Sequence, residues 1–104
     1  MSVLSITFHC PNNNLEEWTK YVDDELFLMT ENLLDVNKYI LSEVQSDYIE
    51  EGKNFNLLLI FDDEGFREDF IKSELQNIAD RIEMNFGQDI MIFNTFLDPL
   101  KSKF

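Results

Sequence analysis

Cysteine is nearly absent from this sequence. Cys10 is the single copy, so no disulfide can form within the chain. The first basic residue is Lys20, so the basic start that a secretory signal needs is missing as well. Because a chain with neither disulfides nor such a signal is typical of a reducing compartment, we expect a cytoplasmic protein.

Basic side chains are also scarce. Lysine and arginine number 8 and acidic residues number 21, which gives a formal net charge of −13. Nucleic acids and anionic lipid surfaces attract proteins through basic side chains, so we expect neither nucleic acid nor a membrane as a partner. In addition, no apolar run approaches the roughly 18 residues needed to span a bilayer.

Glycine and proline, with three and two copies, are scattered singly along the chain. There is no low-complexity tract, internal repeat or linker between two halves. A chain of 104 residues buries roughly two thirds of the surface that its unfolded form exposes, which is enough for a core without a structural metal. The sequence therefore predicts one domain over residues 1–104.

The chain does contain regular hydrophobic patterns. Residues 3–10 alternate between apolar and polar side chains, which predicts a half-buried strand. Apolar residues spaced three and four apart then predict a helix over 15–33, begun by a capping box of Asn14 and Glu17. The predicted buried stripe of this helix consists of Leu15, Trp18, Val22, Leu26, Met29 and Leu33.

The middle of the chain has the pattern of a hairpin. A strand is predicted over 36–48, with the irregular alternation that is typical of a bulge or an edge strand. A turn at 50–53 separates it from the apolar strand 55–61, so these two strands should pair antiparallel. Residues 90–97, rich in β-branched and aromatic side chains, predict a fourth strand that ends at Asp98-Pro99.

A second long helix is predicted between the last two strands. Asp62 or Asp63 can cap its start, and Gly87 is placed to end it. The element order is then βαββαβ, and right-handed crossovers favour one α+β fold for it, the ferredoxin-like sandwich. In this fold the first and third strands are central in a four-stranded antiparallel sheet, and both helices cover one face. The predicted stripe of the second helix is Phe66, Phe70, Ile71, Leu75, Ile78, Ile82 and Phe86.

Several local patterns, taken in order along most of the chain, resemble a small bacterial family that is catalogued as a domain of unknown function, number forty-two eighty-six. The resemblance implies a ferredoxin-like fold akin to the dimeric α/β barrels, and it implies no activity. Members tend to carry a His-Ile-Pro stretch where this chain has Leu26-Phe27-Leu28, so no role of that histidine is carried over. The matching patterns are Glu16-Glu17-Trp18, Gly52, Asn54-Phe55-Asn56-Leu57, Phe86-Gly87 and Ile92-Phe93-Asn94-Thr95-Phe96-Leu97.

No catalytic, cofactor or metal site is predicted. His9 and Cys10 are adjacent, but consecutive strand residues point to opposite faces, so we expect a core cysteine and a histidine at the surface or an interface. The acidic triplets 23–25 and 62–64 lack the alternating spacing of a calcium loop. We therefore interpret both triplets as solvated acidic faces.

The face of the sheet opposite the helices is the candidate contact surface. If the odd-numbered residues of strand 55–61 pack under the helices, the even-numbered ones point the other way, and the fourth strand has apolar residues of both parities. Since exposed apolar surface marks contacts, we predict a homodimer that pairs sheet to sheet. The candidate interface or pocket residues are Ser5, Thr7, His9, Leu58 and Ile60.

Two functions remain open at this point. The first is a non-catalytic association or ligand-sensing module. Its acidity favours a basic protein partner, and the polar residues Ser5, Thr7 and His9 of the first strand could bind a small ligand. The alternative is a small cofactor-independent enzyme similar to the dimeric α/β-barrel monooxygenases or isomerases, with a pocket near His9 that Tyr39 or Thr7 would line. Only fold analogy supports the enzyme, so we rank it second.

Overall fold

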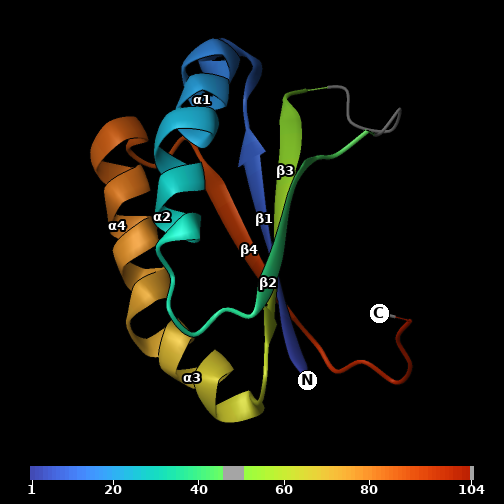
Figure 1. Cartoon of the computed structure of the whole chain (residues 1–104). Helices are drawn as coiled ribbons and strands as arrows, with labels where there is room; N and C mark the ends of the chain where they lie inside the picture. Colours follow the sequence, from blue (N-terminus) through green and yellow to red (C-terminus); the bar gives the residue numbers. More distant parts are fainter. Residues whose placement is uncertain (46–50, 104) are drawn as a thin grey trace.

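The computed structural model describes residues 1–45 and 51–103. Four strands form one antiparallel sheet in the spatial order β2-β3-β1-β4. The helices cover one face of this sheet, and the C-terminal segment lies on the other side (Figure 1). The predicted ferredoxin-like α+β sandwich, with the first and third strands central, is confirmed. The strands are β1 (Ser2–Cys10), β2 (Lys38–Glu43), β3 (Lys53–Phe61) and β4 (Met91–Leu97).

The core lies between the sheet and the helices. Trp18 stands at its centre, fully buried, with its ring centroid 5.6 Å from that of Phe8 and 5.4 Å from that of Phe86. The two central strands each give the core one set of alternate residues, which for β1 is the set that its alternation predicts. These buried strand residues are Leu4, Ile6, Phe8 and Cys10 of β1 and Phe55, Leu57, Leu59 and Phe61 of β3.

The first helical region contains a π turn in its middle. It consists of α1 (Leu15–Tyr21), the π-helical η2 (Val22–Leu26) and α2 (Phe27–Glu31). Four side chains spaced exactly four apart are buried, and since four residues of an α-helix overshoot one turn by about 40°, the wider π turn keeps them in line. Met29 and Leu33, predicted as stripe residues, are therefore only partly buried. The fully buried positions are Trp18, Val22, Leu26 and Thr30.

The capping box predicted at the start of this helix is not formed. Asn14 makes no side-chain cap, and its φ of −111° and ψ of 0° are not the extended geometry of a capping residue. Instead a 3₁₀ turn, η1 (Asn12–Asn14), precedes the helix. The side chain of Asn12 turns to the hairpin end, where its Oδ1 accepts from the Gly52 backbone N–H at 3.0 Å and its Nδ2 donates to Glu51 at 3.0 Å.

The second helix is broken, although the sequence predicts one long helix. It forms α3 (Glu64–Lys72) and α4 (Glu74–Phe86), separated by Ser73, whose φ of −125° and ψ of −72° leave the helical region. The Ser73 hydroxyl donates to the Asp69 carbonyl at 2.8 Å, which closes the last turn of α3. Gly87 ends α4 as predicted, with a positive φ of 62°.

The start of α3 confirms one prediction and corrects another. Asp63 caps the helix by accepting from the Phe66 backbone N–H at 3.0 Å, as proposed from the sequence. Phe66 itself is 38% exposed, however, and the buried residue is its neighbour Arg67. The guanidinium of Arg67 donates to backbone carbonyls at the ends of β1 and β4, so it replaces the expected aromatic contact.

The hairpin has a shorter edge strand than predicted. β2 covers six residues of the predicted 36–48, and the backbone N–H of Val44 adds one further bond, to the Asn54 carbonyl at 2.9 Å. Residues 46–50 of the predicted strand and turn lie outside the described residues. Among the helices that the structure does describe, none has the length and apolarity to cross a membrane.

Candidate functional site on the open face of the sheet

The register of the sheet brings all five predicted site residues to one face, which we call the open face. Ser5 lies opposite Leu58, Thr7 opposite Asn56, and His9 opposite Asn54. On the other side of β1, β4 adds its own alternate residues to the same face. The open face consists of Val3, Ser5, Thr7 and His9 of β1, Asn54, Asn56, Leu58 and Ile60 of β3, Lys38, Ile40 and Ser42 of β2, and Met91, Phe93, Thr95 and Leu97 of β4.

Hydrogen bonds join the polar side chains at the centre of the open face. Asn56 donates from Nδ2 to the Ser5 hydroxyl at 2.8 Å and to the Thr7 hydroxyl at 3.2 Å. His9 Nδ1 lies 2.7 Å from Asn54 Oδ1. Since an amide oxygen only accepts, Nδ1 carries the proton and Nε2 keeps its lone pair. We call these five residues, Ser5, Thr7, His9, Asn54 and Asn56, the polar strip.

The hairpin end packs directly on the imidazole of His9. A side chain at Gly52 would place its Cβ 3.0 Å from His9 Nε2 and 2.3 Å from the Cys10 carbonyl oxygen. Gly52 also has a φ of 83°, which side-chain-bearing residues rarely adopt. A glycine at this position therefore lets the backbone cover one edge of the histidine ring, and this contact together with Asn54 holds the ring in place.

Apolar side chains border the polar strip. Ile40 is 56% exposed on β2, while Met91 and Phe93 are 51% and 50% exposed on β4. Leu97 follows at 42%. Of the predicted candidates, Leu58 is only partly exposed and Ile60 is buried at 7%. The accessible apolar surface therefore comes from the two edge strands rather than from β3. We call Ile40, Met91, Phe93 and Leu97 the apolar border.

Tyr39 does not share a site with His9, so that part of the enzyme interpretation is wrong. The register pairs Tyr39 with Leu59, a residue that faces the helices, and the Tyr39 hydroxyl donates to the Glu31 carboxylate of α2. This hydrogen bond is the main cause that raises the pKa of Tyr39. Because His9 points to the open face, the sheet itself separates the two side chains. Thr7 does lie on the face of His9, within the polar strip.

Cys10 and His9 do not form a nucleophile and base pair. The Cys10 thiol is fully buried among the helix-facing residues and donates to the Pro11 carbonyl at 3.3 Å. Burial, aided by the negative charge of Asp89, raises the pKa of this thiol to about 11. A neutral thiol on the far side of the sheet from the imidazole behaves as a small core residue.

The acidic triplets show no convergence on a metal. Residues 23–25 lie exposed on η2, and residues 62–64 lie exposed at the start of α3, where Asp63 is used as the helix cap. Within residues 1–45 and 51–103, no three histidine, cysteine, aspartate or glutamate side chains come together in a way that could hold an ion.

Sequence reasoning missed the two asparagines of the polar strip. Asn54 and Asn56 were noted only as members of the family pattern Asn54-Phe55-Asn56-Leu57. The alternation of the strand could have revealed them. Both have even numbers, like Leu58 and Ile60, and therefore point to the open face. Amide side chains on a central strand need hydrogen-bond partners, and side chains of the neighbouring strand can provide them.

Comparison with known protein families identifies the family to which this chain belongs. Residues 1–100 match the family described as "Domain of unknown function (DUF4286)". The chain belongs to the DUF4286 family. The resemblance predicted from the sequence motifs is thereby confirmed. A search of curated proteins with the sequence of this DUF4286 chain finds no match.

Solved structures similar to the DUF4286 chain are distant from it in sequence. An ethyl tert-butyl ether d (ethd) family protein from Bacillus halodurans has 11% identity and a TM-score of 0.67, over 91% of this chain and 97% of that one. A dimeric ferredoxin-like protein from an uncultured marine organism has 11% identity and a TM-score of 0.67, over 100% and 99%. A predicted antibiotic biosynthesis monooxygenase from Deinococcus radiodurans has 11% identity and a TM-score of 0.64, over 100% and 99%. At such identities the likeness shows the fold alone.

Proposed function

We propose that this protein is a non-catalytic association or ligand-sensing module, and that two copies pair through the open faces of their sheets. The observation that carries the proposal is the apolar border, whose four side chains are about half exposed on the face opposite the helices. Exposed apolar side chains grouped on one face of a small protein mark a contact surface.

A second copy of the same chain is the partner that fits this face. The apolar border lies on both edge strands, so it flanks the polar strip of the central strands on each side. Two sheets packed face to face about a twofold axis would bury both borders and enclose both polar strips. The similar structure described as a dimeric ferredoxin-like protein supports such a pairing.

The polar strip gives the enclosed space its chemistry. His9 Nε2 keeps a free lone pair, and the hydroxyls of Ser5 and Thr7 accept from Asn56 while retaining their own protons to donate. Such groups require hydrogen-bond partners once water is excluded. A small polar ligand or ordered water between the sheets would supply them. Outside the interface, the charge of −13 favours a basic protein as a further partner.

Sedimentation equilibrium with two matched variants tests the dimer. Phe93→Lys places a charge in the apolar border, whereas Met84→Lys makes the same change in charge at an exposed position of α4. Burying the exposed half of a phenylalanine, about 100 Å², contributes roughly 2.5 kcal/mol, and twofold symmetry counts it twice. We expect a dimer for the wild type and Met84→Lys, and a monomer for Phe93→Lys. A monomeric wild type, or a Phe93→Lys dimer, would contradict the proposal.

The second candidate is a cofactor-independent enzyme of the dimeric α/β-barrel type, with His9 as a base. The fixed orientation of His9 favours it, because the contact of its Nδ1 with Asn54 Oδ1 holds the imidazole on the open face. The similar structure of a predicted monooxygenase adds fold analogy. His9→Gln separates the candidates: an enzyme would lose turnover with its dimer intact, whereas an association module would change only its affinity for a ligand.

A further inference from the structure

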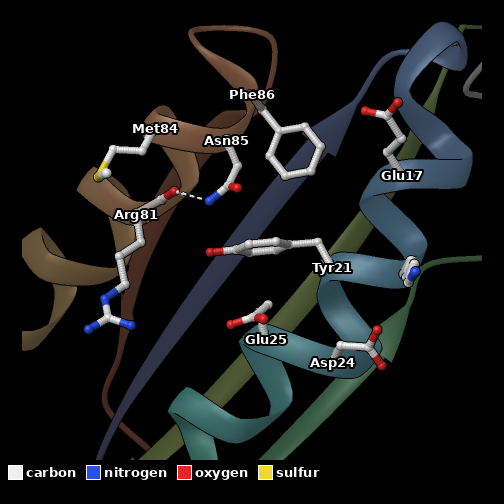
Figure 2. A pocket seen from close by; sticks show the side chains of 9 residues that line it. Glu17, Tyr21, Asp24, Glu25, Arg81, Met84, Asn85 and Phe86 are labelled. Carbon is white, nitrogen blue, oxygen red and sulfur yellow. Dashed lines mark hydrogen bonds between the residues drawn. The ribbon is translucent and has the colours of Figure 1, made fainter.

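A groove lies between the first helical region and α4, away from the open face (Figure 2). Its volume of 690 Å³ lies within the roughly 300–1,000 Å³ of small-molecule sites. Tyr21 and Glu25 line one wall, and Arg81 and Phe86 line the other. None of these residues belongs to the polar strip or the apolar border.

The base of the groove is a packed aromatic cluster. The Tyr21 ring stacks on Trp18 with centroids 5.7 Å apart and an interplanar angle of 17°. Phe86 meets Tyr21 edge-on at 5.3 Å and Trp18 edge-on at 5.4 Å. The indole N–H of Trp18 is buried there and has no hydrogen-bond partner among the described residues. This cluster fixes the position of the half-buried Tyr21 ring, which reaches toward α4 in Figure 2.

The π turn shapes the first wall. Tyr21 directly precedes η2 and Glu25 lies within it, so both groove residues are positioned by the widened turn. π turns are rare within α-helices and are frequent at functional sites. This backbone feature is independent of the side chains that line the groove, and it points to the same place.

Opposite charges face each other across the Tyr21 hydroxyl without pairing. Burial raises the pKa of Tyr21, the Glu25 carboxylate raises it further, and the Arg81 guanidinium opposes both. Glu25 and Arg81 therefore lie within electrostatic reach of the same phenol. Yet they form no ion pair with each other, and no described residue pairs with the Arg81 guanidinium. Asn85 Nδ2 donates to the backbone carbonyl of Arg81 at 2.8 Å, and the guanidinium takes no part in this bond.

We propose that this groove binds a zwitterionic ligand of the aromatic amino acid class. The planar guanidinium of Arg81 receives the ligand carboxylate, and Glu25 receives the ammonium group. The aromatic ring of the ligand packs against the half-buried ring of Tyr21. Carboxylates of Glu17, Asp24 and Glu25 and the basic side chains of Lys20 and Arg81 all line the groove, so both charges of a zwitterion find an opposite charge there. A molecule that carries both charges uses both walls.

This proposal goes beyond the dimer, since the groove lies on the helical side and needs no second copy. Isothermal titration calorimetry with three probes tests it: L-phenylalanine, 2-phenylethylamine without the carboxylate, and 3-phenylpropionate without the ammonium group. We expect L-phenylalanine to bind about tenfold tighter than either analogue, as one lost charge-assisted contact implies. Absence of L-phenylalanine binding at millimolar concentrations, or equal affinity for all three probes, would overturn the proposal.

Two variants assign the ends of the ligand to the walls. Arg81→Gln should weaken L-phenylalanine about tenfold and should not weaken 2-phenylethylamine, which has no carboxylate for Arg81 to bind. Glu25→Gln should weaken L-phenylalanine to the same extent and should not weaken 3-phenylpropionate, which has no ammonium group for Glu25 to bind. Matched controls on α3 are Lys72→Gln and Glu68→Gln, which change the same charges at exposed positions outside the groove. Equal effects of a groove variant and its control on all three probes would refute the assignment.

Discussion

Replacing Arg67 by methionine tests how the helical layer is fastened to the sheet. Arg67 is buried, and its Nη1 donates to the backbone carbonyls of Val3 at 3.0 Å and Leu97 at 3.3 Å and contacts the Asp98 carboxylate at 3.2 Å. Methionine fills much of the same space but donates no hydrogen bond. A buried carbonyl left without a partner costs roughly 1–3 kcal/mol, so removing the Nη1 donor that two carbonyls share should lower the free energy of unfolding by about 3 kcal/mol.

Thermal unfolding followed by circular dichroism measures this loss. For a domain of this size, about 3 kcal/mol corresponds to a decrease of roughly 12 °C or more in Tm. The control is Lys72→Met, which removes the same charge from an exposed position of the same helix. Arg67→Lys should fall between the two, because an ammonium group can still donate to these acceptors but is more strongly hydrated than a guanidinium and therefore costs more to bury. Equal melting temperatures for Arg67→Met and Lys72→Met would refute the reasoning.

Three further predictions concern the hairpin contact, the net charge and the buried thiol. Gly52→Ala should cost about 1–3 kcal/mol and shift the NMR signals of His9, whereas Gly87→Ala, with open space around its Cβ, should leave His9 unchanged. Raising the salt concentration to about 0.3 M, where the Debye length is roughly 6 Å, should raise Tm by screening the charge of −13, and a flat curve would mean that the carboxylates are locally compensated. The free energy of unfolding should fall as pH rises from 9.0 to about 11, because the unfolded Cys10 thiol ionises before the folded one, and Cys10→Ala should reduce this slope in a denaturant titration.

Local patterns predicted β1 well because this strand has one unambiguous apolar parity, whereas β3 is apolar at both parities, so its facing could be predicted only conditionally. The break at Ser73 could not be predicted in this way. A serine is ordinary in a helix, and the apolar spacing continues from Phe70 to Leu75 across it. Local sequence patterns also could not predict that Arg67, rather than Phe66, is the buried residue in the first turn of α3. The burial of Arg67 depends on two strand ends that meet only in the folded chain.

The residues of the candidate site also fall into those that strand alternation could place and those that depend on tertiary contacts. Parity alone places Ser5, Thr7 and His9 on one face of β1, so these could be predicted before any contact was known. The face of the sheet on which Tyr39 lies depends on the register of β2 against β3, and the irregular alternation of β2 does not predict that register. The groove was hidden for a similar reason, since Tyr21 and Arg81 are far apart in sequence and meet only where the two helical regions pack.

The π turn at Val22–Leu26 has the effect of a one-residue insertion in an otherwise regular helix. In a regular α-helix of the same length, Trp18 and Thr30, which are twelve residues apart, would be turned about 120° away from each other. They could then no longer both face the sheet. A regular α-helix with one residue fewer would bring the two positions back to within about 20° of the same face. The length of this segment and its helical geometry are therefore coupled, and a change in one without the other would remove either Trp18 or Thr30 from the core.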